Sequence, residues 1–131
     1  MSHSNEGSAA GFQQDLAAVP SSLALVRREL DRLLARQRVS PGRVADVRLA
    51  VTEACANAVV HAYAEGEAGT VRVTAAIERE ILVVIVRDYG GGIPARRPPA
   101  VLGMEMMRAV ADGVSIEACD PGMAVRLEFR L

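Results

Sequence analysis

The sequence predicts an α+β domain in which a mixed, mainly antiparallel sheet is covered by helices on one face, forming a two-layer sandwich. Two segments with helical periodicity come first, two strand-like segments follow, and a short helix with two further strand-like segments ends the chain. The 131 residues suffice for one core. Because 50% of the residues are hydrophobic but only 3% are aromatic, that core must be mainly aliphatic.

The N-terminal residues 1–14 are mostly polar or small and show no apolar period, so we expect a flexible arm there and a single domain over residues 15–131. After Pro20, apolar residues recur at helical spacing, and either Ser21 or Ser22 can cap this first helix. The opposite face of the helix carries charged residues, namely Arg27, Arg28, Asp31, Arg32 and Arg36.

The middle of the chain predicts a long helix followed by a hairpin. The pair Ser40-Pro41 is a strong helix start, and we expect the helix to run from Pro41 to about Ala64. Residues 70–77 alternate between apolar and polar, as a half-buried strand does. Residues 81–86 are continuously apolar and mostly β-branched, which favours a buried central strand.

The last third of the chain begins with a stretch rich in glycine and proline, from Tyr89 to about Leu102, for which we expect irregular structure. A helix over about residues 103–112 and a strand over residues 114–119 follow. The turn Asp120-Pro121-Gly122 then leads into a last alternating strand.

Charge and composition exclude several classes of function. All fifteen basic residues are Arg, which rules out the lysine of a Walker A loop and that of a eukaryotic-type protein kinase. A net charge of -1 argues against binding to nucleic acid. With no apolar segment long enough for a bilayer and no leader, we expect a cytoplasmic protein. Cys55 and Cys119 are then expected to be buried apolar residues rather than a disulfide.

The long helix carries a polar stripe within a run of small apolar residues. Glu53, Asn57 and His61 are each four positions apart, so they lie on one helix face. A solvated helix face would explain such a stripe. The alternative is a site in which the amide oxygen of Asn57 binds a hard cation beside a carboxylate that can accept a proton.

Two glycine-containing segments are further candidates for a binding site. Asp88 ends the buried strand, and Gly90 and Gly92 after it would let the backbone approach a flat ligand whose amino group donates to the carboxylate. A plain loop with an exposed Asp is the alternative. Gly103 opens a helix, whose free N–H groups suit phosphate oxygens. The methionines that follow, Met104 among them, favour core packing.

In this order, the three segments resemble the N, G1 and G2 boxes of the GHKL, or Bergerat-fold, ATPase superfamily. The anti-sigma factor serine kinases are the most similar members, on the residues Leu49–Tyr63 and Gly103–Asp112. The resemblance extends over about Leu16–Leu131, and it implies the two-layer Bergerat fold.

The resemblance implies ATP and Mg²⁺ as ligands and assigns a role to each motif. Asn57 would ligate the Mg²⁺ ion that bridges the ATP phosphates, and Glu53 would be the general base for the attacking hydroxyl. Asp88 would accept a hydrogen bond from the adenine amino group. The other residues that it places at the nucleotide are His61, Gly90, Gly92, Ile93, Gly103 and Met104.

The implied function is a homodimeric serine kinase that binds a sigma factor and phosphorylates a STAS-domain antagonist, with the arginine-bearing face of the first helix as a candidate partner surface. A degenerate, non-catalytic nucleotide- or protein-binding module is the alternative. The lid between Ile93 and Gly103 is short, and Val101 replaces the first glycine of the usual pair. Met123 and Ala124 stand where relatives have a threonine after glycine. A sensor histidine kinase is disfavoured, because no segment supplies its dimerisation helices.

Overall fold

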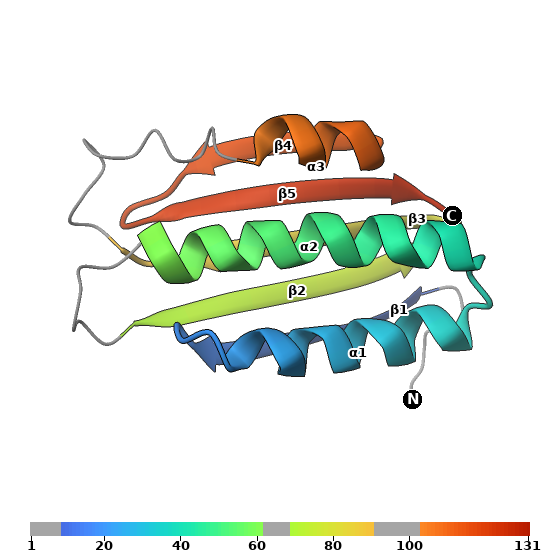
Figure 1. Ribbon diagram of the computed structural model, residues 1–131, viewed down its shortest axis with the longest axis horizontal. Coiled ribbons are helices and arrows are strands. Elements are labelled where there is room, and N and C mark those ends of the chain that lie inside the picture. Colours follow the sequence, from blue (N-terminus) through green and yellow to red (C-terminus); the bar gives the residue numbers. More distant parts are fainter. Residues whose placement is uncertain (1–8, 62–68, 91–102) are drawn as a thin grey trace.

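The computed structural model describes residues 9–61, 69–90 and 103–131, which form a two-layer α+β sandwich (Figure 1). Within these residues one five-stranded sheet has the order β1-β2-β3-β5-β4. The strands are β1 (Ala9–Ala17), β2 (Thr70–Glu78), β3 (Ile81–Asp88), β4 (Gly113–Ala118) and β5 (Met123–Arg130). The helices are α1 (Ser22–Arg36), α2 (Pro41–His61) and α3 (Met104–Val110).

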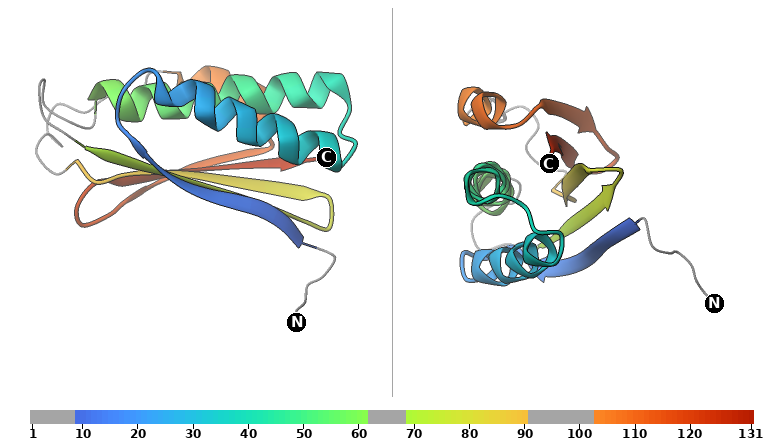
Figure 2. Two further views of the ribbon diagram at one scale, coloured as in Figure 1. Left: turned by 90° about the horizontal axis from the view of Figure 1, so that it is seen from below. Right: turned by 90° about the vertical axis from the view of Figure 1, so that its right-hand side faces the viewer.

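Every strand pair in the described sheet is antiparallel, so the mixed sheet that we allowed for resolves into a purely antiparallel one. The three described helices lie on the same side of the sheet, and no helix among the described residues lies on the other face (Figure 2). The α+β fold class predicted from the sequence is therefore confirmed.

The core lies between the helices and the inward face of the sheet. Inward residues alternate along each strand, because successive side chains point to opposite faces. In β3, for example, Leu82, Val84 and Val86 are at most 2% exposed. They meet Leu30 and Leu34 of α1 and the small residues of α2 in one continuous cluster. Phe129 is the one fully buried ring among the described residues, so the core is aliphatic as predicted.

The prediction of a flexible arm over residues 1–14 is wrong for residues 9–14, which belong to β1. This edge strand pairs with β2 from Ala9↔Glu78 to Ala17↔Thr70. Its inward positions include Phe12 and Leu16, which pack against the core, but also the polar Gln14. An edge strand with one polar inward residue has a weak alternation, which hides it in the sequence.

The starts of the two long helices differ in how they are capped. Ser21 makes no side-chain capping bond, and the Ser22 hydroxyl donates instead to the carbonyl of Ala17 at 2.7 Å. The predicted serine cap of α1 is therefore wrong, and Ser22 ties the helix to the end of β1. At α2, the backbone N–H of Arg43 donates to Ser40 Oγ at 3.4 Å, so the predicted start at Pro41 is confirmed.

Arg43 joins the start of α2 to the end of α3 and to the end of β5. Its guanidinium donates to the carbonyl oxygens of Arg130 at 2.9 Å and Val110 at 3.0 Å, pairs with Asp112, and lies over the Phe129 ring at 5.6 Å. The pKa of Asp112 is lowered, first because the Arg130 backbone N–H donates to the carboxylate, and then by the charge of Arg43. One side chain thus closes this end of the sandwich.

Candidate functional site

The central helix α2 carries the polar stripe predicted from the sequence. Glu53 and Asn57 lie one turn apart, and both side chains are half-buried. Ala54 and Ala58 beside them are buried in the core. The stripe therefore follows the border of the core, where polar groups are partly shielded from water. His61 is the last residue of α2, and its side chain lies outside the described part of the structure.

Gly103, just before α3, brings the third motif against Glu53. Its φ of +80° lies in the left-handed region that favours glycine. A Cβ atom at position 103 would lie 2.5 Å from both Cγ and Oε2 of Glu53. A side chain at position 103 would require the Glu53 side chain to move, so two segments distant in the sequence meet at this point.

The methionines of α3 pack mainly into the core, as the sequence predicted. Met107 is only 1% exposed, and Met104 packs against the same cluster from a half-buried position. Core packing holds the short helix beside α2. A contact of Met104 with nucleotide stays a prediction.

Asp88 ends β3 on the inward face of the sheet and is only 6% exposed. Its Oδ1 accepts a hydrogen bond from the backbone N–H of Gly90 at 3.1 Å, which orients the carboxylate at the start of the loop. Because the residue is buried, the alternative of an exposed loop Asp is wrong. Gly92 and Ile93, also predicted at this site, lie outside the described residues.

Gly122, in the turn between β4 and β5, is a site residue that sequence reasoning missed. Its φ is +94°, and a Cβ atom there would overlap with the carbonyl oxygen of Asp88 and lie 2.9 Å from Oδ1. The next residue, Met123, pairs directly with Asp88 across the two strands. The turn sequence Asp120-Pro121-Gly122 is typical of a left-handed conformation at the glycine. Nothing local in the sequence, however, indicated that Gly122 would contact Asp88.

The three motifs lie toward the same end of the molecule. The end of α2, the end of β3 and the turn between β4 and β5 lie at the left of Figure 1, and α3 begins nearer the middle, with its start facing that end. Close contacts join Glu53 to Gly103 and Asp88 to Gly90 and Gly122. The arrangement offers a carboxylate beside a helix start and, at the same end, a buried carboxylate at a strand end.

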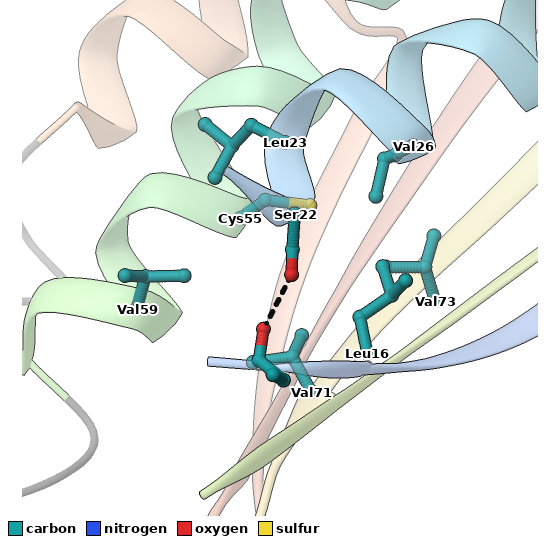
Figure 3. A pocket seen from close by; sticks show the side chains of 9 residues that line it. Leu16, Ser22, Leu23, Val26, Cys55, Val59, Val71 and Val73 are labelled. Atoms are coloured by element: carbon teal, nitrogen blue, oxygen red, sulfur yellow. Dashed lines mark hydrogen bonds between the residues drawn. The ribbon is translucent and has the colours of Figure 1, made fainter. Parts of the chain in front are cut away.

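A small apolar cavity lies on the other side of α2, between that helix, the start of α1 and the sheet (Figure 3). Its volume is about 10 Å³, which is room for one water molecule at most. Cys55 lines it, and burial raises the pKa of this thiol to about 12, so the thiol stays protonated and apolar as predicted. Cys119 is only half-buried, and both cysteines are free. The cavity is too small for a nucleotide.

Two features are absent from the described residues. No three His, Cys, Asp or Glu side chains among them cluster closely enough to hold a metal ion. No helix in the described part is both long and apolar enough to span a membrane.

Comparison with known families assigns the chain. A family model described as the histidine kinase-like ATPase domain matches residues 16–129. The chain belongs to this family. The resemblance to GHKL ATPases inferred from the three motifs is therefore confirmed, and the match includes every segment that carries a predicted site residue.

Three curated proteins to which the chain is similar come from Bacillus. The serine-protein kinase RsbW of Bacillus pumilus (strain SAFR-032) is 32% identical over 94 residues, covering 70% of this chain and 58% of that protein. RsbW of Bacillus subtilis (strain 168) is 33% identical over 79 residues, covering 60% and 49%. The anti-sigma F factor of Bacillus subtilis (strain 168) is 25% identical over 131 residues, covering 89% and 90%. The chain thus spans about half the length of the RsbW proteins it matches.

A solved structure supports the same assignment. The crystal structure of the RsbU and RsbW domains of Rv1364c from Mycobacterium tuberculosis matches with a TM-score of 0.76 and 26% sequence identity. The match covers 93% of this chain and 32% of that chain. This ATPase-like domain is therefore a unit that also occurs inside a longer protein.

Replacing Gly103 by Ala should distinguish the role expected for Glu53, as the general base, from that expected for Asp88, in binding the base of the nucleotide. The new methyl group would displace the Glu53 carboxylate, and the left-handed backbone would cost about 1–2 kcal/mol of stability. We expect phosphoryl transfer to fall more than ATP affinity, measured by labelled-phosphate transfer and calorimetry. If both stayed at wild-type values, the contact between Gly103 and Glu53 would have no part in the site.

Proposed function

We propose that this chain is an ATP-dependent serine protein kinase that acts as a cytoplasmic anti-sigma factor. It would bind a sigma factor and phosphorylate a serine of a STAS-domain antagonist. The observation that supports this most is the Glu53 carboxylate seated at Gly103, at the same end of the molecule as buried Asp88, in a chain of the histidine kinase-like ATPase family.

The residues at this end fit ATP with Mg²⁺. Because Gly103 and Gly122 have no side chain, their backbone packs directly against Glu53 and Asp88, which brings both carboxylates close to main-chain groups. Asn57 would supply an amide oxygen to the ion, which would neutralise phosphate charge when bound, with the remaining ligands coming from phosphate and water. Asp88 would accept from the adenine amino group, and the loop residues Gly90, Gly92 and Ile93 would admit the ring.

Catalysis would depend mainly on positioning. The serine oxygen of the partner would form a bond to the γ-phosphorus as the bond between that phosphorus and the β,γ-bridging oxygen breaks, leaving ADP. Glu53 would take the proton of the serine hydroxyl. Gly103 holds the Glu53 carboxylate to one side, and His61 and Met104 are proposed to line the same nucleotide site.

Calorimetry and a transfer assay test the proposal together. Wild-type protein should bind ATP in the presence of Mg²⁺ and should pass labelled γ-phosphate to a serine of a STAS-domain protein encoded in the same genome. ATP binding without transfer to any such protein would point to a nucleotide-binding regulatory module. No heat and no thermal shift at millimolar ATP would favour the module that binds protein alone.

A groove between the first two helices is the surface we propose for the protein partner. We call it the α1–α2 groove; it is formed by two adjoining hollows of about 350 and 470 Å³ that share Ala45 and Arg48. Arg27 lines one side, and Arg48 pairs with Asp31 across it at 3.3 Å. Leu49 lies in the groove with 48% of its surface exposed. An apolar floor with arginines above it suits a helix that presents carboxylates beside an apolar residue.

Charge reversal at Arg27 should weaken partner binding without affecting ATP. Arg27→Glu would place a carboxylate in the groove against the acidic side of the partner, and we expect about a tenfold loss of affinity, or 1.4 kcal/mol. Arg28→Glu is the matched control, because Arg28 is exposed on the same helix but does not line the groove. Isothermal titration with the sigma factor and the antagonist compares the two. Equal losses in both variants would contradict a specific role of the groove.

The proposed assembly also includes a homodimer, as in the family that the sequence resembles. Light scattering of the purified chain measures its mass directly. A monomer of 13.9 kDa at micromolar concentration would remove the dimer from the proposal without affecting the nucleotide site.

A further inference from the structure

Arg87 lies next to Asp88 in β3 but on the opposite face of the sheet, away from the three helices that the structure describes. Its Nε donates to the carbonyl oxygen of Asp88 at 3.2 Å, and its Nη2 donates to the carbonyl oxygen of Pro121 at 2.9 Å. Its guanidinium also lies over the ring of Tyr89, 4.3 Å from the centroid. One half-buried side chain therefore contacts β3, the residue after it and the turn between β4 and β5.

These contacts hold the backbone of Asp88 from both sides. The turn is closed by a hydrogen bond from the Cys119 N–H to the Gly122 carbonyl at 2.9 Å, and Gly122 rests against the carbonyl and Oδ1 of Asp88. Arg87 fastens that turn to β3 through Pro121. Hydrogen bonds from a charged donor are stronger than neutral ones, so these two bonds are a strong polar link between the turn and β3.

A neighbouring arginine, Arg72, shows that Arg87 differs from other positive charges on this face in the groups that it contacts. Arg72 pairs directly with Arg87 across β2 and β3, on the same face of the sheet. Its Nε and Nη2, however, donate to Asp15 of β1 at 2.7 and 3.2 Å. The two arginines carry the same charge and lie side by side on the same face of the sheet. Of the two, Arg87 contacts the turn beside Asp88 and Arg72 does not.

We propose that Arg87 is a positioning residue for the base of the nucleotide, acting through the backbone of Asp88 and the turn at Gly122. The proposal rests on the proposed function, since it requires adenine at Asp88. A carboxylate accepts hydrogen bonds but donates none, so it favours a base with an amino group over one with a carbonyl oxygen at the same position. Such discrimination requires the carboxylate to be held in place, because a misplaced acceptor loses the hydrogen bond that distinguishes the two bases.

The test compares the affinities of ATP and inosine triphosphate, which carries a carbonyl oxygen in place of the adenine amino group. Wild-type protein, Arg87→Ala, Arg87→Lys and Arg72→Ala are titrated with both nucleotides in the presence of Mg²⁺. We expect Arg87→Ala to lower the preference for ATP about tenfold, mostly by weakening ATP. Arg72→Ala should leave the preference within about twofold. Arg87→Lys should be intermediate, because an ammonium cannot bridge both carbonyls and stack on Tyr89.

Amide hydrogen exchange of the nucleotide-free protein gives a second readout. The N–H group of Gly90 donates to Asp88 Oδ1, and that of Cys119 donates to the Gly122 carbonyl. Both groups should exchange faster in Arg87→Ala than in wild-type protein, and at the wild-type rate in Arg72→Ala. If Arg87→Ala fails to fold, Arg87→Lys takes its place in both measurements.

The outcomes separate the two proposals. A wild-type protein that prefers ATP, together with an Arg87→Ala variant that keeps the full preference, overturns the role of Arg87 and leaves the nucleotide site standing. A wild-type protein that binds neither nucleotide overturns both. Normal ATP preference with no phosphoryl transfer removes the kinase but keeps Arg87 as a positioning residue, provided that its variant loses the preference.

Discussion

Replacing Glu53 by Gln is expected to slow phosphoryl transfer to the partner serine by about 10²–10⁴-fold, the usual contribution of a general base. The amide keeps the shape that fits against Gly103 but no longer accepts the hydroxyl proton. ATP affinity should change by less than about threefold, because Asp88 and Asn57, which are proposed to hold the nucleotide, are untouched. Single-turnover transfer from labelled ATP and calorimetry measure the two quantities.

A matched control for this variant lies in α3. Glu105 is exposed in the first turn of that helix, and Glu105→Gln makes the same chemical change at the same end of the molecule. It should transfer phosphate at nearly the wild-type rate. Undiminished transfer by Glu53→Gln, with the control also active, would show that another group takes the proton.

Replacing Gly122 by Ala is expected to have the largest effect on the adenine side of the site. The left-handed backbone at this position costs about 1–3 kcal/mol with a side chain present, and the new Cβ atom would overlap with the Asp88 carbonyl. We expect a lower melting temperature and at least a tenfold loss of ATP affinity. Thermal unfolding and calorimetry with ATP and Mg²⁺ measure the two effects.

Gly42 provides the control for Gly122. A Cβ atom at position 42, near the start of α2, would meet nothing within 4 Å. Gly42→Ala should therefore raise stability by about 0.4–1 kcal/mol and leave ATP affinity unchanged. If Gly122→Ala bound ATP as tightly as Gly42→Ala does, the turn between β4 and β5 would lie away from the base.

The sequence predicted most of the secondary structure because the periodicities were strong. Residues 70–77 and 81–86, predicted as strands, lie within β2 and β3, and the long helix begins at Pro41 as expected. The edge strand β1 was missed because Gln14 interrupts its apolar face. Ser22 was expected as a cap, but a tertiary hydrogen bond to Ala17 competes for its hydroxyl. Such competition depends on contacts that local sequence does not encode.

For the candidate site, the sequence indicated which side chains to consider, but not which backbone segments lie next to them. Glu53 and Asp88 have clear chemical patterns, since one lies in a helical stripe and the other at a strand end. The role proposed for Gly122 rests on its approach to Asp88, a contact between separate parts of the chain that the strand register reveals. The same holds for Arg87, whose partner Pro121 is distant in sequence.

Arg43 has a consequence for how α3 can move. Its hydrogen bond to the Val110 carbonyl and its ion pair with Asp112 anchor the C-terminal end of α3, whereas Gly103 at the other end touches Glu53. A helix that is held at its C-terminal end can move most at its N-terminal end. Any tilt of α3 would therefore be small at Val110 and greatest at Gly103, so the Glu53 carboxylate is the group that such a tilt would affect most.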